Sequence, residues 1–482
     1  MLEVKKYPIK IGPSARRTLL RPFVPGNPTQ VEHILFRIFS TPRDKMKIRM
    51  DQIYDKLDAK GQELKNTFLK HFEHVESKIP ANFPLSDLEK EFIGAFFTQQ
   101  YALESTAVFN PSIVPHPVQD KDGVFKFILS LRAIGEGHIS SITFMEGEIE
   151  PSLNISCSAD DSTLIFEPQR IQHYYEKKLF IKTASELNLI SHLNKPVFDL
   201  LSPHFQFYEL EKAINQIIKN NRTTNKSELQ DSLNKLRLIA QSNFTLRFHT
   251  PNLLERAIYP ASPSQSNGLE DARFVHFVND DGSTTYYATF SAYDGETVMP
   301  EMLETKDFQE FKISTLNGPA AKNKGMALFP RKINGSFMMV GRQDNESLYL
   351  MKSDNPYFWY DSQPLIKPTY TWENIQIGNC GSPIEIDEGW LLLTHGVGPI
   401  RTYALGAVLL DKNEPWRVLG RLKEPLLQPA KDESSGYVPN VIYTCGALAY
   451  NRTLILPYAI GDVIATFATV SIDDLVYKLK NN

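Results

Sequence analysis

The sequence predicts an all-β core, a five-bladed β-propeller, with an N-terminal helical region and a helical insertion. Three observations predict it: hairpin signals recur about every fifty residues, the N-terminal part has helical periodicity, and a second helical stretch separates the first two hairpins. Each hairpin unit is a sheet too small to bury both faces alone. Packing such sheets around an axis buries the faces and leaves only short edges.

The helical regions are predicted from the spacing of apolar residues. In residues 44–78 these recur near the period of a helix, at Ile48, Ile53, Leu57, Leu64, Phe68 and Phe72. Residues 86–103 begin with a serine and an aspartate, which suit the start of a helix. We assign residues 1–104 to the N-terminal helical region and residues 105–482 to the propeller. The insertion covers about residues 169–243, a polar, lysine-rich stretch dotted with leucine.

Five polar tight turns, each flanked by apolar strands, mark the hairpins. They are DKDG (120–123), NDDG (279–282), ING (333–335), DEG (387–389) and YNR (450–452). Successive turns are roughly fifty to sixty residues apart, except where the helical stretch intervenes between the first two. Five hairpins therefore predict five blades.

The composition excludes several classes of function. A net charge of -4 gives no reason to expect nucleic acid or a membrane surface as a partner. The three cysteines, Cys157, Cys380 and Cys445, are widely spaced, which argues against a zinc site or a disulfide framework. The sequence has no apolar signal segment and no apolar run of transmembrane length. We expect a cytoplasmic protein that uses no metal and no cofactor.

The repeat also aligns polar residues at equivalent places in successive hairpins. Before the five turns lie Asn110, Asp271, Lys324, Gly378 and Asn440. After the turns, the returning strands end at Arg132, Ser291, Arg342, His395, and Tyr458 with Asp462. Equal offsets in equivalent blades imply equivalent positions in space. We therefore expect these residues to converge at one end of the central channel, as in the concave polar sites where ligands bind.

Asp271, in NGLEDARF, is the candidate catalytic acid. A carboxylate two residues before an arginine, here Arg273, is by itself more often part of a structural ion pair. Asp271 is, however, the only carboxylate among the positions that precede the turns. To donate a proton near neutral pH its pKa must be raised, which burial favours and Arg273 opposes.

Four basic residues near the channel end form a candidate anion site. They are Lys324, Arg256, His395 and Arg401. The planar fork of arginine and the point charge of lysine suit a phosphate group. The alternative is that bases of this wider set, which includes Arg132 and Arg342, cap strand ends or pair with glutamates. We expect about half of them to be structural.

Several segments carry a family resemblance. In order they are FNPSIV, SLRAIGEGH, NGLEDARFV, NKGMALFPRKINGSF, GSPIEIDEGWLLLTHGVG, LGAVLLD and GYVPNVIYTCG. They resemble glycoside hydrolase family 130, the β-mannoside phosphorylase and mannosidase family, over about residues 105–160 and 244–482. The resemblance implies a five-bladed propeller and an inverting attack on a β-mannosidic bond. In the family's phosphorylases, inorganic phosphate is the nucleophile and α-mannose 1-phosphate is a product.

The resemblance also implies roles for individual residues. Asp271 matches the aspartate that protonates the leaving oxygen through a sugar hydroxyl. Positions that hold the mannose match Asn110, Arg132 and Asp462, and a phosphate-binding lysine matches Lys324. To the substrate-binding set we add Arg273 and Tyr458. From charge and repeat position we add to the phosphate-binding set Arg256, His395 and Arg401.

Three functions stay open on the sequence. A phosphorylase needs one acid and a basic cradle, because phosphate is already anionic. An inverting β-mannosidase on the same scaffold needs a second carboxylate to activate water, and the candidates include Glu136 and Glu270. A non-catalytic sugar-binding propeller is disfavoured by Asp271. We expect a mannoside or oligosaccharide and phosphate as ligands and, from the apolar faces of the helices, a homo-oligomer. Neither the linkage nor the acceptor sugar can be read from the residues.

Overall fold

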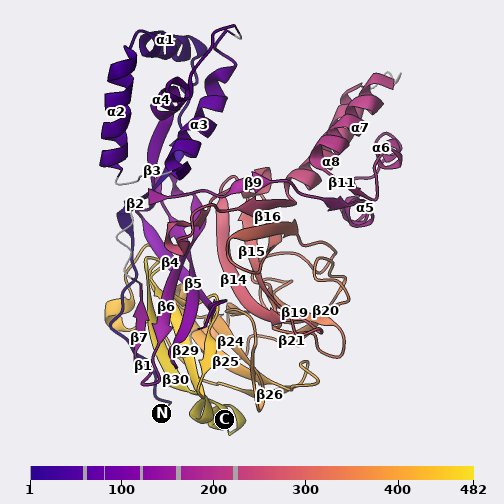
Figure 1. Cartoon of the computed structure of the whole chain (residues 1–482). Coiled ribbons are helices and arrows are strands. Elements are labelled where there is room, and N and C mark those ends of the chain that lie inside the picture. The colour runs from indigo at the N-terminus through magenta and orange to yellow at the C-terminus, as the bar shows by residue number, and fades with distance from the viewer. Residues whose placement is uncertain are drawn as a thin grey trace.

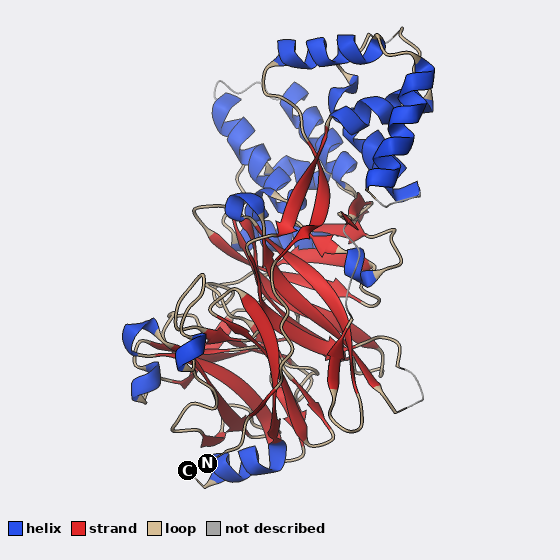
Figure 2. Cartoon of the chain, turned by 90° about the vertical axis from the view of Figure 1, so that its left-hand side faces the viewer, coloured by secondary structure: helices blue, strands red, loops and turns tan. Residues whose placement is uncertain are grey.

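The computed structural model describes residues 2–57, 62–80, 82–119, 123–158, 164–220 and 226–481. Figure 1 shows a core of strands with two helical lobes at one end, and Figure 2 shows both termini together at the other end. Within these residues no helix is long and apolar enough to cross a membrane. Most of the first predicted turn, residues 120–122, lies outside the described residues.

The first lobe is helical, as predicted. It contains α1 (Pro28–Phe39), α2 (Arg43–Lys56), α3 (Gln62–Glu76) and α4 (Asp87–Phe96). Helix α4 begins with a capping box in which Ser86 and Glu89 satisfy each other's backbone N–H groups. A Cβ on Gly94 of α4 would lie 1.9 Å from the carbonyl oxygen of Phe68 in α3, so glycine permits the close crossing of these helices.

Strands connect this lobe to the core. β2 (Ser14–Pro22) pairs with β3 (Thr98–Glu104) and, in parallel, with β8 (Leu164–Ile165). The helix predicted over residues 86–103 therefore ends at Phe96, because the residues after it enter this ladder and bury Leu103. β1 (Lys5–Lys6) pairs with β30 (Ile464–Ser471) near the C-terminus, which explains why the two termini lie together.

The β core divides into five antiparallel units that follow one another along the chain. The first unit contains β4 (Ala107–Pro115), β5 (Phe125–Ile134), β6 (Ser140–Ile149), β7 (Ile155–Cys157) and β13 (Ala257–Ile258). The second contains β14 (Gly268–Val278), β15 (Thr284–Tyr293), β16 (Val298–Thr305), β17 (Glu310–Thr315), β12 (Phe244–Arg247) and β9 (Gln169–Ile171).

The remaining three units repeat the same meander. The third contains β18 (Ala327–Leu328), β19 (Phe337–Gly341), β20 (Leu348–Ser353) and β21 (Asp361–Ile366). The fourth contains β22 (Gln376–Asn379), β23 (Ile384–Ile386), β24 (Gly389–Val397), β25 (Tyr403–Leu410) and β26 (Val418–Arg421). The fifth contains β27 (Ile442–Tyr443), β28 (Leu448–Tyr450), β29 (Thr453–Ile460), β30 (Ile464–Ser471) and β1. Short 3₁₀ helices connect strands: η1 (Glu136–His138), η2 (Leu253–Glu255), η3 (Pro263–Gln265), η4 (Thr371–Glu373), η5 (Pro399–Arg401) and η6 (Lys431–Glu433).

Backbone contacts join neighbouring units into a ring. The first and second units meet where Ser140 pairs with Gly268. Further bonds run from Val278 N to Pro330 O (2.8 Å), Ile377 N to Glu346 O (2.8 Å), Tyr403 N to Asn440 O (2.9 Å) and Val108 N to Val463 O (2.9 Å). The last of these closes the fifth unit on the first. This is the sheet order of a five-bladed propeller, and the predicted mostly-β core with an N-terminal helical region is confirmed.

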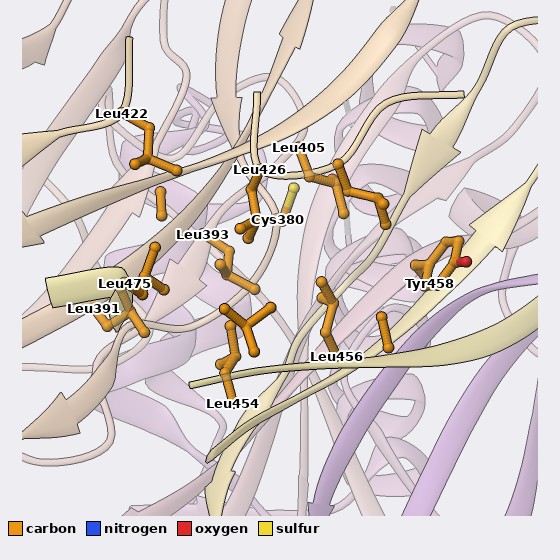
Figure 3. Packing of buried hydrophobic residues seen from close by; sticks show 14 of the residues in the cluster. Cys380, Leu391, Leu393, Leu405, Leu422, Leu426, Leu454, Leu456, Tyr458 and Leu475 are labelled. Atoms are coloured by element: carbon orange, nitrogen blue, oxygen red, sulfur yellow. The ribbon is translucent and has the colours of Figure 1, made fainter. Parts of the chain in front are cut away.

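Apolar side chains fill the space between adjacent units. Figure 3 shows the cluster between the fourth and fifth, where Leu393 and Leu405 face Leu454 and Leu456. Leu475 of α9 (Ile472–Lys480) joins the same cluster. Each buried leucine stabilises the fold by about 1.5–3 kcal/mol relative to exposure. This packing holds the strand ends of neighbouring units in fixed positions.

The second lobe is the helical insertion. It contains α5 (Lys177–Glu186), α6 (Lys195–Asp199), α7 (Phe207–Asn220) and α8 (Lys226–Gln241), with β10 (Tyr175–Glu176) paired to β11 (His204–Phe205). It has its own core, in which Phe205, Leu210 and Leu233 are fully buried. The helices begin later than predicted, because residues 169–171 form β9 and pair with β12 at the edge of the second unit.

Candidate active site

A cavity of about 240 Å³ lies at one end of the ring, and all five units contribute to it. The polar and charged residues that line it are Asn110, Arg132, Asp271, Arg273, Lys324, Arg342, Gln376, Asn379, His395, Arg401, Tyr403, Tyr443 and Asp462. Most of the positions aligned by the repeat are therefore brought together. In the successive units these residues lie near the start of the first strand or near the end of the strand paired with it.

Asp271 and Asn110 reach the cavity through equivalent bulges in the first long strand of their units. The register of β14 shifts between Glu270 and Arg273, and that of β4 shifts between Phe109 and Ser112. At the bulges Asp271 has φ 54° and Asn110 has φ 49°. A side chain held in this left-handed region costs about 1–3 kcal/mol, and bulges commonly re-aim side chains at functional sites.

The carboxylate of Asp271 is held by three partners. Asn110 Nδ2 donates to Oδ1 (2.7 Å), Arg132 Nη1 donates to the same oxygen (3.3 Å), and Arg273 Nη2 lies 3.8 Å from Oδ2. Burial raises the pKa of Asp271, but the charges of Arg132 and Arg273 and the bond from Asn110 outweigh it, and the pKa lies below its usual value. Asp271 is therefore ionised near neutral pH, because the opposition expected from Arg273, joined by that of Arg132, outweighs the effect of burial on its pKa.

Asp462 is a second carboxylate in the cavity, with the opposite behaviour. Burial, together with the nearby negative charge of Asp271, raises its pKa to about 7, while Arg132 opposes the shift. Two carboxylates in one site thus have pKa values that are shifted in opposite directions.

Glu270 is occupied by two cations. Arg132 Nη2 donates to its Oε1 (3.0 Å), and Lys324 Nζ contacts its Oε2. Glu136, the other candidate base, lies in η1 and is exposed, outside the residues that line the cavity. Neither glutamate is arranged as a free base beside Asp271.

The third and fourth units provide the basic wall of the cavity. Arg342 Nη1 donates to Nε2 of His395 (3.3 Å). Burial lowers the pKa of His395 well below its ordinary value, and the charges of Arg342 and Arg273 act the same way, so the imidazole is neutral. Its ring lies over Gly378, where a Cβ would come within 2.4 Å of Cε1. His395 therefore orients Arg342 and does not itself add positive charge.

Two of the predicted site residues are not brought to the cavity. Arg256 donates to the carbonyl oxygens of Thr250, Phe308 and Pro251, so its guanidinium ties a loop to the second unit. Tyr458 is 1% exposed and lies in the apolar cluster between the fourth and fifth units (Figure 3). Alternate residues of a strand face opposite sides, and the repeat offset did not distinguish those sides.

The structure adds several lining residues that the sequence did not single out. Tyr443 accepts a hydrogen bond from Arg273 Nη2 (2.8 Å) and so fixes the arginine that faces Asp271. Gln376 and Asn379 flank Gly378, which was one of the aligned positions. Their place beside that position was the available signal. Among the described residues, no group of His, Cys, Asp and Glu is arranged to hold a metal ion.

Residues 237–481 match the model of glycoside hydrolase family 130, described as beta-1,4-mannooligosaccharide phosphorylase. The chain is also 38% identical over 218 residues to the 1,2-beta-oligomannan phosphorylase of Thermoanaerobacter sp. (strain X514), a match that covers 44% of this chain and 70% of the relative. The protein belongs to glycoside hydrolase family 130, an enzyme family of β-mannoside phosphorylases, and the resemblance noted in the sequence is confirmed.

Two solved structures that are similar to this chain cover most of its length. The β-1,2-mannobiose phosphorylase of Listeria innocua, in complex with β-1,2-mannobiose, is 21% identical and gives a TM-score of 0.48, with 79% of this chain and 94% of that chain covered. A second structure, 16% identical with a TM-score of 0.45, covers 77% of this chain and 86% of that one. That structure is described as one from the family 130 mannoside phosphorylases, a family that also contains glycoside hydrolases that target β-1,2-mannosidic linkages in Candida mannan.

Proposed function

We propose that the protein is an inverting β-mannoside phosphorylase that uses inorganic phosphate to release α-mannose 1-phosphate. The observation that supports this most is the division of the cavity. Its carboxylates come from the second and fifth units, as Asp271, which Arg132 and Arg273 neutralise, and Asp462. The other bases of the lining, Lys324, Arg342 and Arg401, come from the third and fourth units or the loops beside them. Mannose binds on the first side and phosphate on the second. The name of the Thermoanaerobacter relative favours a β-1,2 linkage.

Asp271 supplies the proton in this proposal. A phosphate anion on the basic wall adds negative charge near the carboxylate, which raises its pKa from the low value that Arg132 and Arg273 impose. Asp271 then takes up a proton as phosphate binds. That proton passes through a sugar hydroxyl to the leaving oxygen as the C1–O bond breaks and a phosphate oxygen bonds to C1 from the opposite face. The products are the 1-phosphate and the shortened acceptor.

The sugar-holding residues follow from the same geometry. Asn110 and Arg132 each bond Asp271, so they set its direction as well as lining the cavity. Asp462 can donate to or accept from a sugar hydroxyl because its pKa lies near neutrality. Arg273 donates a hydrogen bond to the hydroxyl of Tyr443, which fixes its guanidinium beside Asp271. Arg256 and Tyr458 have no part in the proposal.

A β-mannosidase is the second candidate, and Asp462 is the observation that favours it. An inverting hydrolase needs a second carboxylate to activate water, and Asp462 lines the same cavity as Asp271. The two functions separate in one assay. With β-1,2-mannobiose as substrate, the phosphorylase turns over only with inorganic phosphate, whereas equal release of free mannose in phosphate-free buffer establishes the hydrolase.

A further inference from the structure

Asn379 presents a buried amide that nothing in the fold uses. It ends β22, where its backbone pairs with Thr394 of β24, and the residue is 1% exposed. Neither Oδ1 nor Nδ2 has a hydrogen-bond partner among the described residues, although the side chain lines the cavity. Burying an amide without partners costs free energy, and such groups in native proteins call for an explanation, of which a ligand is one.

The surroundings of Asn379 indicate which ligand. The amide lies on the basic side of the cavity, near Gly325, where a Cβ would be 3.9 Å from its Oδ1. Arg342, on the same side, has a buried Nε without a partner while its Nη1 is bonded to His395. Two unsatisfied N–H donors from neighbouring units therefore line the wall that also carries Lys324 and Arg401. Donors of this kind suit an anion.

We infer that Asn379 binds inorganic phosphate, with Nδ2 donating to one phosphate oxygen and Oδ1 accepting from a P–OH group. An amide can play both roles, whereas lysine and arginine cannot accept and an ionised carboxylate cannot donate. Near neutral pH phosphate retains a P–OH group, whereas sulfate has none. Asn379 therefore selects phosphate over sulfate. The inference rests on the proposed function, since it deepens the account of the phosphate side.

The test is calorimetric titration of inorganic phosphate and, separately, of sulfate into the protein without sugar. Asn379→Ala removes both hydrogen bonds, and Asn379→Leu removes them while keeping the volume. Gln363→Ala, an exposed amide in β21, is the matched control. We expect phosphate affinity to fall about ten- to a hundredfold in both Asn379 variants. Sulfate affinity falls less, so the preference for phosphate shrinks. The control behaves like the wild type.

Two further readouts make the outcome unambiguous. The melting temperature without ligand should not fall in Asn379→Leu, because an unsatisfied amide is removed. Binding of β-1,2-mannobiose alone should change less than about twofold. Wild-type phosphate affinity in both variants overturns the inference and leaves the proposed function intact. Loss of mannobiose affinity instead assigns the amide to the sugar and also overturns it. A wild-type protein that neither binds nor requires phosphate overturns the proposed function and the inference together.

Discussion

The two sides of the cavity are built by the same repeat but differ in how their charges are compensated. On the side of Asp271, the carboxylate has three partners, and Arg132 bridges it to Glu270. On the side of Arg342, a guanidinium leans on a neutral histidine and an amide has no partner at all. Buried donors without partners occur on both sides, at Arg132 Nε and Arg273 Nε as well as at Arg342 Nε and Asn379 Nδ2. The sides differ because Arg132 and Arg273 already face carboxylates, whereas Arg342 faces a neutral imidazole, so the side of Arg342 is the one suited to an anion.

The largest effect on turnover is expected on the side of Asp271. Asp271→Asn should reduce turnover by about two to four orders of magnitude, the usual scale for general acid catalysis, while the melting temperature changes little. Steady-state rates on β-1,2-mannobiose with phosphate measure it. Asp280→Asn, in the turn that follows β14, is the matched control and should be nearly silent. β-1,2-Mannobiose has a poor leaving group, so near-wild-type turnover of this substrate by Asp271→Asn would show that Asp271 is not the catalytic acid.

Phosphate use should depend on Lys324, which contacts Glu270 and lines the cavity. Lys324→Ala should raise the KM for phosphate about tenfold to a hundredfold, because a charge-assisted hydrogen bond contributes about 1.5–3 kcal/mol, with a smaller effect on the KM for the mannoside. Lys332→Ala is the matched control, since that lysine pairs with Asp280 away from the cavity. Equal increases of the KM for phosphate and the KM for the mannoside would instead show that Lys324 contributes to sugar binding as well.

The raised pKa of Asp462 predicts a contribution to folding stability that depends on pH. The folded protein holds this proton up to a pKa of about 7, whereas an unfolded chain releases it near about 3.9. The contribution to stability is therefore complete below about pH 4 and is lost as the pH rises toward 7. From pH 5 to pH 8 the melting temperature should fall less for Asp462→Asn than for the wild type, and Asp280→Asn should follow the wild type. An unchanged pH dependence in Asp462→Asn would mean that the carboxyl is ionised throughout.

The smallest effect is expected for Tyr458, which lies in the apolar cluster and does not line the cavity. Tyr458→Phe preserves the packing of the cluster in Figure 3, so kcat and both KM values should stay within about twofold of the wild type. A larger change in the KM for the mannoside would bring Tyr458 back to the substrate. The full steady-state comparison with the wild type at pH 7 is sufficient.

The repeat predicted much of the site because it records position along each blade. Asn110, Asp271 and Arg132 converge as their offsets imply, and bulges common to β4 and β14 aim the first two inward. Offset does not record which face of a strand a side chain takes. Tyr458 shares an aligned position with Asp462 but turns into the apolar cluster.

Electrostatic behaviour was harder to predict than position. Burial suggested a raised pKa for Asp271, but only the structure shows how closely Arg132 and Asn110 approach it. The charge assigned to His395 fails for a related reason, since its pKa is lowered by burial beside Arg342. Both outcomes depend on contacts between units far apart in the sequence, which local patterns do not encode.

The most direct test of the central claim is the identity of the first product. The wild-type enzyme is mixed with β-1,2-mannobiose and inorganic phosphate, and proton and phosphorus NMR spectra are recorded from the earliest turnover. We expect α-mannose 1-phosphate to form in equal amount to mannose, with no reaction when phosphate is omitted. Free mannose as the only product, formed at the same rate without phosphate, would contradict it.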